Sequence, residues 1–195
     1  MRAQTLVASL EGLAGASQLS GGCSSVMFPA TPMSDPVTIR QARAADRPQL
    51  LRAVIELQDH ERRLHATRLP GAEIADAYLA WIESRAADSG AILVAEMEGG
   101  FAGFAAGWIE QGDSIAETPD SNRFGLISDI CVMPAYRSRR IAARLLDGLE
   151  EHLGAAGVTR LRIASLAMNR AARASYERAG FAPYEIFYEK PIGKL

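Results

Sequence analysis

The chain has 195 residues and a mass of 21.0 kDa, and 48% of its residues are hydrophobic while 23% are charged. This length and composition fit one globular domain, alone or with a tail, and they exclude a fibrous repeat and wholesale disorder. The 21 basic and 23 acidic residues give a net charge of −2, so no global basic field favours nucleic acid or an anionic membrane. No run of about 18 apolar residues occurs, and two cysteines are too few for a disulfide framework. We therefore expect a cytoplasmic protein with no nucleic-acid partner and no membrane partner.

The first 36 residues differ in composition from the rest of the chain. They carry three charged residues and are otherwise rich in Ala, Gly, Ser and Leu. Their longest apolar run ends at Leu10 and is too short for a signal peptide. We predict a poorly ordered extension over residues 1–36 and one folded domain over residues 37–195.

Hydrophobic periodicity predicts the elements of that domain in chain order. Alternating or short apolar runs predict strands over 37–40, 91–97, 101–109, 124–132 and 160–166, near Phe181 and over 186–189. Helical spacing predicts helices over about 46–63, 72–89, 138–153 and 170–179. The early hairpin followed by strand–helix alternation predicts an α/β fold with helices on both faces of one sheet.

A cluster of arginines stands where the third long helix is predicted to begin. Arg137, Arg139, Arg140 and Arg144 crowd this helix N-terminus, where the helix dipole disfavours each cation by roughly 0.3–1 kcal/mol. A bound anion between these side chains and the free backbone N–H groups would explain the cluster. The alternative is a solvated arginine run in which Ser138 is an ordinary N-cap.

Two motifs of the chain resemble those of the GCN5-related N-acetyltransferase (GNAT) family. Arg137-x-x-Arg140-x-Ala142, after Val132-Met133-Pro134, is similar to the family's acetyl-CoA signature Arg/Gln-x-x-Gly-x-Gly/Ala, with Arg140 in the usual glycine position. Asn169-x-x-Ala172-x-x-x-Tyr176-x-x-x-Gly180-Phe181 looks like the family's second signature. The resemblance covers about residues 37 to 190.

The resemblance implies a GNAT-like α/β fold, with a mixed, mostly antiparallel sheet of about six to seven strands flanked by about four helices. It also implies acetyl-CoA as a co-substrate, without a metal ion. The residues implied in acetyl-CoA binding are Ile130, Cys131, Val132, Arg137, Ser138, Arg139, Arg140, Ile141, Ala142, Ala143, Asn169, Ala172 and Tyr176.

The family's reaction is direct acetyl transfer to an amine, and it needs a base because an alkylamine with a pKa of about 10.4 is protonated at neutral pH. Asp129 is the first candidate base, and its alternative role is to pair with a neighbouring arginine. The resemblance makes Tyr176 the proton donor to the leaving thiolate, and the alternative is a packed aromatic ring. The backbone N–H near Val132 would stabilise the oxyanion.

The acceptor is less defined by the sequence. His60 and Glu61 lie where the family walls its acceptor site, although a solvated helix face is the favoured explanation for either residue taken singly. Cys131 within an apolar strand favours a buried, inert thiol over an acyl-enzyme nucleophile. We expect a small-molecule amine acceptor and, as alternatives, a protein N-terminus or lysine, or a CoA-binding regulator with weak activity. A homodimer is compatible with the family.

Overall fold

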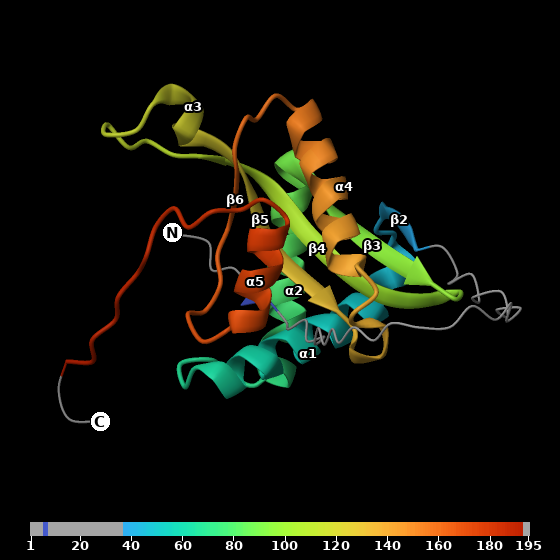
Figure 1. Cartoon of the computed structure of the whole chain (residues 1–195). Coiled ribbons are helices and arrows are strands. Elements are labelled where there is room, and N and C mark those ends of the chain that lie inside the picture. Colours follow the sequence, from blue (N-terminus) through green and yellow to red (C-terminus); the bar gives the residue numbers. More distant parts are fainter. Residues whose placement is uncertain (1–5, 8–36, 193–195) are drawn as a thin grey trace, which may run out of the picture.

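The computed structural model describes residues 6–7 and 37–192 (Figure 1). Five α-helices occur in this part of the chain: α1 Arg47–Leu64, α2 Gly71–Ser89, α3 Pro119–Asn122, α4 Ile141–Ala155 and α5 Arg170–Arg178. The strands are β1 Leu6–Val7, β2 Thr38–Gln41, β3 Gly90–Met97, β4 Gly100–Gln111, β5 Arg123–Val132 and β6 Leu161–Ile163. Two short 3-10 turns, Ala44–Asp46 and Pro134–Tyr136, precede α1 and follow β5.

All six strands belong to one mixed sheet. Its order is β1-β5-β4-β3-β2, and β6 also pairs with β5. The neighbours β2/β3, β3/β4 and β4/β5 are antiparallel, whereas β1 and β6 run parallel to β5. Five of these strands have three or more residues, and β1 has two. The expectation of a mixed, mostly antiparallel sheet is therefore confirmed in this part of the chain.

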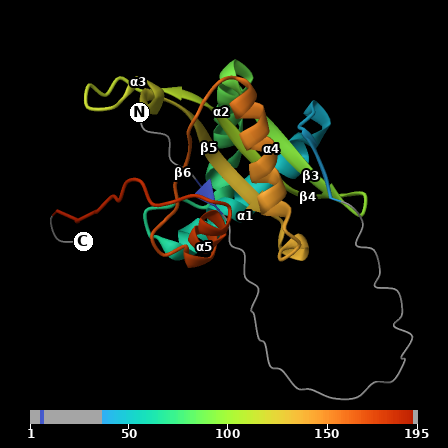
Figure 2. The ribbon, with the colours of Figure 1, turned by 45° about the horizontal axis from the view of Figure 1, so that its top comes forward.

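Helices cover both faces of the sheet, as the element order predicts (Figures 1 and 2). On one face the apolar stripe of α4, which includes Ile141, Leu145 and Leu149, forms a core with the sheet and with α5. On the other face α1 and α2 form a second core around Phe104 and Trp108 of β4. Strand β4 is buried from Ala102 to Trp108 because helices pack on both sides of it.

Three sequence expectations need correction. No strand forms near Phe181 or over 186–189 in the described structure; these residues are extended but join no strand. The strand predicted over 160–166 is only Leu161–Ile163, because the chain diverges from β5 after Ile163. The described residues also contain five α-helices rather than about four, the additional one being the four-residue α3 in a predicted loop.

Helix α4 begins at Ile141, three residues later than predicted. Both Ser138 and Arg140 have a positive φ, 64° and 59°, and this left-handed backbone is incompatible with an α-helix. The arginine cluster therefore lies in a turn before the helix. No helix of the described residues is long and apolar enough to span a membrane.

Candidate active site

The candidate site lies where β6 separates from β5. Strand β6 pairs with Gly125, Leu126 and Ile127, while the same edge of β5 pairs with β1 at Asp129 and Ile130. On the other edge of β5, Gly107 pairs with Ile127 and Ala106 pairs with Asp129, so that Ser128 is an extra, bulged residue. A bulge bends its strand and changes the direction of nearby side chains. The bulge thus marks the point where the sheet edge divides, next to Asp129.

Asp129 is fully buried and accepts two side-chain hydrogen bonds. Its Oδ2 accepts from the Ser128 hydroxyl at 2.5 Å, and its Oδ1 accepts from the Tyr78 hydroxyl of α2 at 3.1 Å. Burial raises the pKa of the Asp129 carboxyl from 3.8 to about 7, while these two hydrogen bonds lower it. A carboxyl group with a pKa near neutrality can accept a proton at physiological pH. The alternative role for Asp129 was to pair with a neighbouring arginine, and none of these hydrogen bonds comes from an arginine.

A second buried carboxylate lies within electrostatic reach of Asp129. Glu61 of α1 is completely buried and forms an ion pair with Arg68, whose Nε lies 3.0 Å from Glu61 Oε2. The negative charge of Glu61 contributes to the raised pKa values of Asp129 and Tyr176. The structure therefore places Glu61 near both predicted catalytic residues, and it is not on a solvated helix face.

Tyr176 comes from α5, on the face of the sheet opposite to the helix that carries Glu61. Its ring is buried and packs edge to face on Phe181, with 6.1 Å between the ring centroids. Its hydroxyl is buried and has no hydrogen-bond partner among the described residues. Burial, followed by the charges of Glu61 and Asp129, raises its pKa well above 10, so the hydroxyl stays protonated. Tyr176 is thus a proton donor that lacks an acceptor in the described structure.

The first turn of α5 is held by Asn169. The Asn169 side chain caps the helix, because its Oδ1 accepts a hydrogen bond from the Ala172 N–H at 3.2 Å. Both residues are buried. This cap fixes the start of the helix that carries Tyr176, which is a structural role for two residues expected to contact acetyl-CoA.

Two of the three arginines in the turn before α4, Arg137 and Arg139, have protein partners. Arg137 donates to the Val132 carbonyl at 3.2 Å and to the Glu56 carboxylate of α1 at 3.0 Å. Arg139 donates to Glu98, in the turn between β3 and β4, at 2.5 Å. Arg140 is the N-cap of α4 in the left-handed conformation that glycine adopts without strain. The left-handed backbone at this position therefore explains why the family motif usually has a glycine here.

The other predicted residues divide into core and surface positions. Those buried in the core are Ile130, Val132, Ile141 and Ala142, whereas Ser138 and Ala143 are exposed. Burial raises the pKa of the Cys131 thiol to about 12, which confirms the expectation of a buried, protonated thiol. His60 is half-buried, and burial lowers the pKa of its imidazole.

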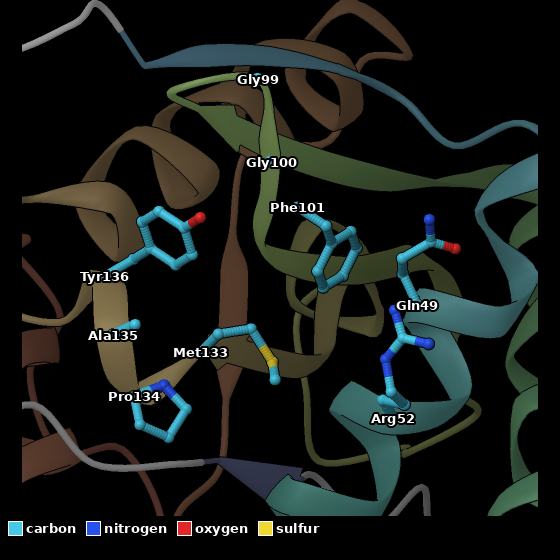
Figure 3. A pocket seen from close by; sticks show the side chains of 9 residues that line it. All are labelled: Gln49, Arg52, Gly99, Gly100, Phe101, Met133, Pro134, Ala135 and Tyr136. Atoms are coloured by element: carbon cyan, nitrogen blue, oxygen red, sulfur yellow. The ribbon is translucent and has the colours of Figure 1, made fainter.

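An open cavity of about 530 Å³ lies next to the turn that follows β5 (Figure 3). It is bounded by the start of α1, the β3–β4 turn and the turn after β5, and the figure shows Arg52 and Gln49 opposite Tyr136, with Phe101 between them. Gly100 allows the close approach of this wall, because a Cβ there would lie 2.7 Å from the Tyr136 hydroxyl. Neither Asp129 nor Tyr176 lines this cavity.

Sequence reasoning missed Tyr78 and Arg68. Tyr78 belongs to the apolar stripe of α2, and its hydrogen bond to Asp129 joins residues 51 positions apart. Arg68 lies after the end of α1, in a segment without periodicity. The described residues contain no group of three or more His, Cys, Asp or Glu residues that could hold a metal ion.

Comparison with known proteins identifies the class of this fold and site. The model of the acetyltransferase (GNAT) family matches residues 51–181, about two thirds of the chain. The chain belongs to the GNAT acetyltransferase family. None of the curated proteins compared with the sequence matches it.

Solved structures share the fold at low sequence identity. The aminoglycoside N-acetyltransferase AAC(6')-Iy in complex with CoA matches with a TM-score of 0.61 and 22% identity, over 84% of this chain and 100% of that one. A GCN5-related N-acetyltransferase from Ralstonia eutropha JMP134 matches with a TM-score of 0.63 and 21% identity, over 80% and 99% of the two chains. A predicted acetyltransferase from Clostridium acetobutylicum, solved with acetyl-CoA, matches with a TM-score of 0.60 and 18% identity, over 80% and 96%. These likenesses establish the fold.

Proposed function

We propose that this protein transfers an acetyl group from acetyl-CoA to a primary amine of a small molecule. One observation carries the proposal: a buried carboxyl group with a pKa of about 7 lies on β5 where β6 leaves it, and its charge reaches a buried, protonated tyrosine hydroxyl. A base that takes the proton of the ammonium ion and an acid that assists the departing thiolate are what acetyl transfer from a thioester to an amine requires. The membership of the GNAT family supports this assignment.

Asp129 is the proposed general base. In its ionised form it attracts the ammonium form of the acceptor and accepts a proton from it, either directly or through one water. Tyr78 and Ser128 hold the two carboxylate oxygens, so the side chain has a fixed direction. Tyr78 is therefore a positioning residue.

Tyr176 is the proposed general acid. The phenol, with an ordinary pKa of about 10, donates a hydrogen bond to the departing sulfur of a thiol whose ordinary pKa is about 8.5. Full proton transfer is unnecessary, since a hydrogen bond already stabilises the developing thiolate. The lack of a partner for this hydroxyl among the described residues supports the role.

The residues of this chain fit acetyl-CoA as the acetyl donor. Acetyl-CoA supplies the acetyl group as a reactive thioester. Residues 138–140 would hold its phosphates, because two positive-φ residues before the N-terminus of α4 direct backbone N–H groups toward an anion. Arg140 carries no assigned ion pair within the described residues and is the cation best placed to contact a phosphate.

The acceptor is proposed to be small and cationic. Asp129, Glu61 and Tyr176 are all buried, so a reacting amine must enter an enclosed site. Among the described residues assigned to the site, Glu61 and Asp129 carry carboxyl groups and Arg68, paired with Glu61, carries a guanidinium. This excess of carboxyl groups favours an ammonium ion over a carboxylate-bearing acceptor.

The test is release of the CoA thiol from acetyl-CoA with a panel of primary amines, in which diamines and amino sugars are compared with amino acids and with lysine-containing peptides. Mass spectrometry identifies the acetylated product. We expect turnover with cationic small molecules, a loss of at least 100-fold in kcat for Asp129→Asn, and parental rates for Asp147→Asn, an exposed α4 control. Turnover with lysine-containing peptides alone would show that the acceptor is a peptide or protein amine and not a small molecule. Binding of acetyl-CoA with no turnover on any amine would instead identify a CoA-binding regulator.

A further inference from the structure

The proposed reaction does not use the open cavity between the start of α1, the β3–β4 turn and the turn after β5. Its volume of about 530 Å³ is within the range of about 300–1,000 Å³ that is typical of small-molecule sites. Along β4, Phe101 is five residues from Ala106, the pairing partner of Asp129, a distance of about 17 Å. Along α1, Arg52 precedes Glu61 by nine residues, or about 14 Å. The cavity is therefore remote from the proposed catalytic residues.

The apolar walls of this cavity are anchored in both cores of the protein. Tyr136 packs against the core formed by α4, whereas Phe101 and Met133 pack against the core formed by α1 and α2. All three side chains are half-buried. Figure 3 shows the Phe101 ring between Tyr136 and the side chains that come from α1. Because aromatic rings and a thioether sulfur attract a further aromatic ring, these walls fit a flat aromatic ligand.

Three polar side chains around the cavity have no partner within the described part of the chain. The side chains of Gln49, Arg52 and Tyr136 form no hydrogen bond or ion pair with other described residues. Gln49 and Arg52 are three residues apart in the first two turns of α1 and therefore lie on one face of the helix. In the nearby turn, by contrast, Arg137 and Arg139 are paired with glutamates. The cation of Arg52 is thus available to a ligand.

The charge of the cavity wall selects an anion. Among the described residues that line the cavity, Arg52 carries the one charged side chain. A guanidinium binds a carboxylate or a phosphate through two parallel N–H donors, and the Gln49 amide offers a further donor. A wall with a cation and without a carboxylate does not attract the ammonium ion proposed as acetyl acceptor. The ligand that fits both the rings and the charge is a small aromatic anion.

We propose that this cavity is a second binding site, which takes a small molecule that carries an aromatic ring and an anionic group. The ring lies between Phe101 and Tyr136, and the anionic group contacts Arg52 and Gln49. The site is separate from the acetyl-transfer site. This inference is independent of the proposed function.

The first test is binding of phenylacetate to the full chain, followed by two-dimensional NMR of the backbone amides. We expect a Kd of about 5 mM or tighter, with the largest shifts at residues 49–52, 99–101 and 133–136. The neutral phenylacetamide and the non-aromatic cyclohexylacetate should each bind at least about fivefold more weakly. Phenyl phosphate, compared with phenylacetate, identifies the preferred anionic group. Shifts confined to other residues, or phenylacetamide that binds as tightly as phenylacetate, would overturn the proposal.

Substitutions assign the binding to particular side chains of the cavity. Arg52→Gln removes the cation and Phe101→Leu removes one ring, so each should raise the Kd of phenylacetate at least about fivefold. Arg62→Gln removes the same charge from an exposed position further along α1 and is the matched control, with a Kd within about twofold of the parent. Thermal melting verifies that each variant is folded. An unchanged Kd in Arg52→Gln would rule out this cavity as the anion site.

The last test asks whether the cavity is separate from the acetyl-CoA site. Phenylacetate is titrated with and without saturating acetyl-CoA, and the shifts that acetyl-CoA itself causes report whether it binds. A failure of the proposed function is therefore seen separately from a failure of this inference. We expect the Kd of phenylacetate to change less than about threefold. Displacement of phenylacetate by acetyl-CoA would show that the cavity is part of the acetyl-CoA site and would reject a second site.

Discussion

At the residue scale, the surroundings of Asp129 shift the pKa of its carboxyl group in opposite directions. Burial and the charge of Glu61 raise the pKa of its carboxyl group, whereas the hydrogen bonds from Ser128 and Tyr78 lower it. The balance leaves the pKa at about 7. If Asp129 is the base, activity must rise with pH as this carboxyl loses its proton, and kcat/KM must level off above about pH 8.

The first prediction uses these neighbours to shift the pH profile in both directions. Ser128→Ala and Tyr78→Phe each remove a hydrogen bond to the carboxylate, so the acid limb of kcat/KM should shift to higher pH. Glu61→Gln removes a negative charge and should shift the limb to lower pH. Profiles recorded from pH 5 to 9 provide the measurement, with Asp147→Asn as the unshifted control. If the acid limb of kcat/KM stays at the same pH in all three variants, Asp129 is not the base.

The second prediction concerns Tyr176. Replacing it by Phe keeps the ring packed against Phe181 and removes only the hydroxyl. Because this hydroxyl has no hydrogen-bond partner among the described residues, stability should hold or increase slightly. Turnover should fall by about 10²-fold or more while the Kd of acetyl-CoA changes less than about threefold. Steady-state kinetics and calorimetric titration separate the two effects, and an unchanged kcat would assign Tyr176 to packing alone.

The third prediction tests the backbone at Arg140. A non-glycine residue with a φ of 59° is strained by about 1–2 kcal/mol, part of which glycine loses again through its greater freedom in the unfolded chain. Arg140→Gly should therefore raise the free energy of unfolding by about 0.5–1 kcal/mol. Arg144→Gly, within the exposed part of α4, should lower it by about 1 kcal/mol. Urea unfolding without ligand measures both, and equal losses in the two variants would contradict the strain at Arg140.

Residue types and spacing indicated some members of the site but not their partners. Asp129, Tyr176 and Glu61 stand in motifs or in predicted elements, and the structure brings these three together. The hydrogen bond from Tyr78 depends on how α2 crosses β5, which local periodicity does not encode. The arginine cluster was compatible with an anion site or with a solvated arginine run, and in the structure Arg137 and Arg139 form ion pairs with glutamates from α1 and from the β3–β4 turn.

At the element scale, the divided edge of β5 is the feature that positions the site. The bulge at Ser128 and the departure of β6 leave Asp129 and Ile130 with a free edge, and β1 pairs there in this structure. If acetyl-CoA binds along residues 130–132, as the family resemblance implies, it competes with β1 for this edge. The expected extension over residues 1–36 falls outside the described residues except for Leu6–Val7, which form this strand.

The fourth prediction follows from that competition and rests on the proposed function. Val7→Pro removes a backbone N–H from β1 and weakens its pairing with β5. Since β1 must leave the edge before acetyl-CoA enters, the variant should bind acetyl-CoA about three- to tenfold more tightly. Val7→Ala keeps the N–H and is the matched control. Calorimetric titration gives both values of Kd, and a weaker affinity in Val7→Pro would mean that β1 supports the site.

Long amphipathic elements were predictable, whereas elements that depend on a distant partner were not. The apolar stripes of α1 and α4 and the hairpin of β3 and β4 have periods that identify them before any contact is known. The segment after Gly180 has an equally clear strand pattern, yet it joins no strand among the described residues. Periodicity predicts which face of a strand is apolar, but the existence of the strand depends on an available edge.

At the scale of the whole molecule, the site joins the two halves of the fold. Tyr78 and Glu61 come from the helices on one face of the sheet, and Tyr176 comes from α5 on the other face. Asp129 lies between them on β5, next to the middle strand β4 of the sheet. Helices on both faces bury this carboxyl group, and the burial that raises its pKa also reduces the stability of the protein.

The last prediction measures that loss of stability. A carboxyl group whose pKa is 3.8 when unfolded and about 7 when folded destabilises the native state progressively as pH rises from about 4 to 7, and by about 4 kcal/mol above pH 7. Asp129→Asn cannot ionise and keeps a side chain of the same shape. Its melting temperature relative to the parent should therefore increase between pH 5 and pH 8.5, by about 5 °C or more. Calorimetric melting at the two pH values gives the difference, and Asp147→Asn provides the control for an exposed charge. A difference in melting temperature that does not change with pH would mean that the native protein keeps Asp129 ionised at little cost in stability. The buried carboxylate would then need a counter-charge from outside the described residues.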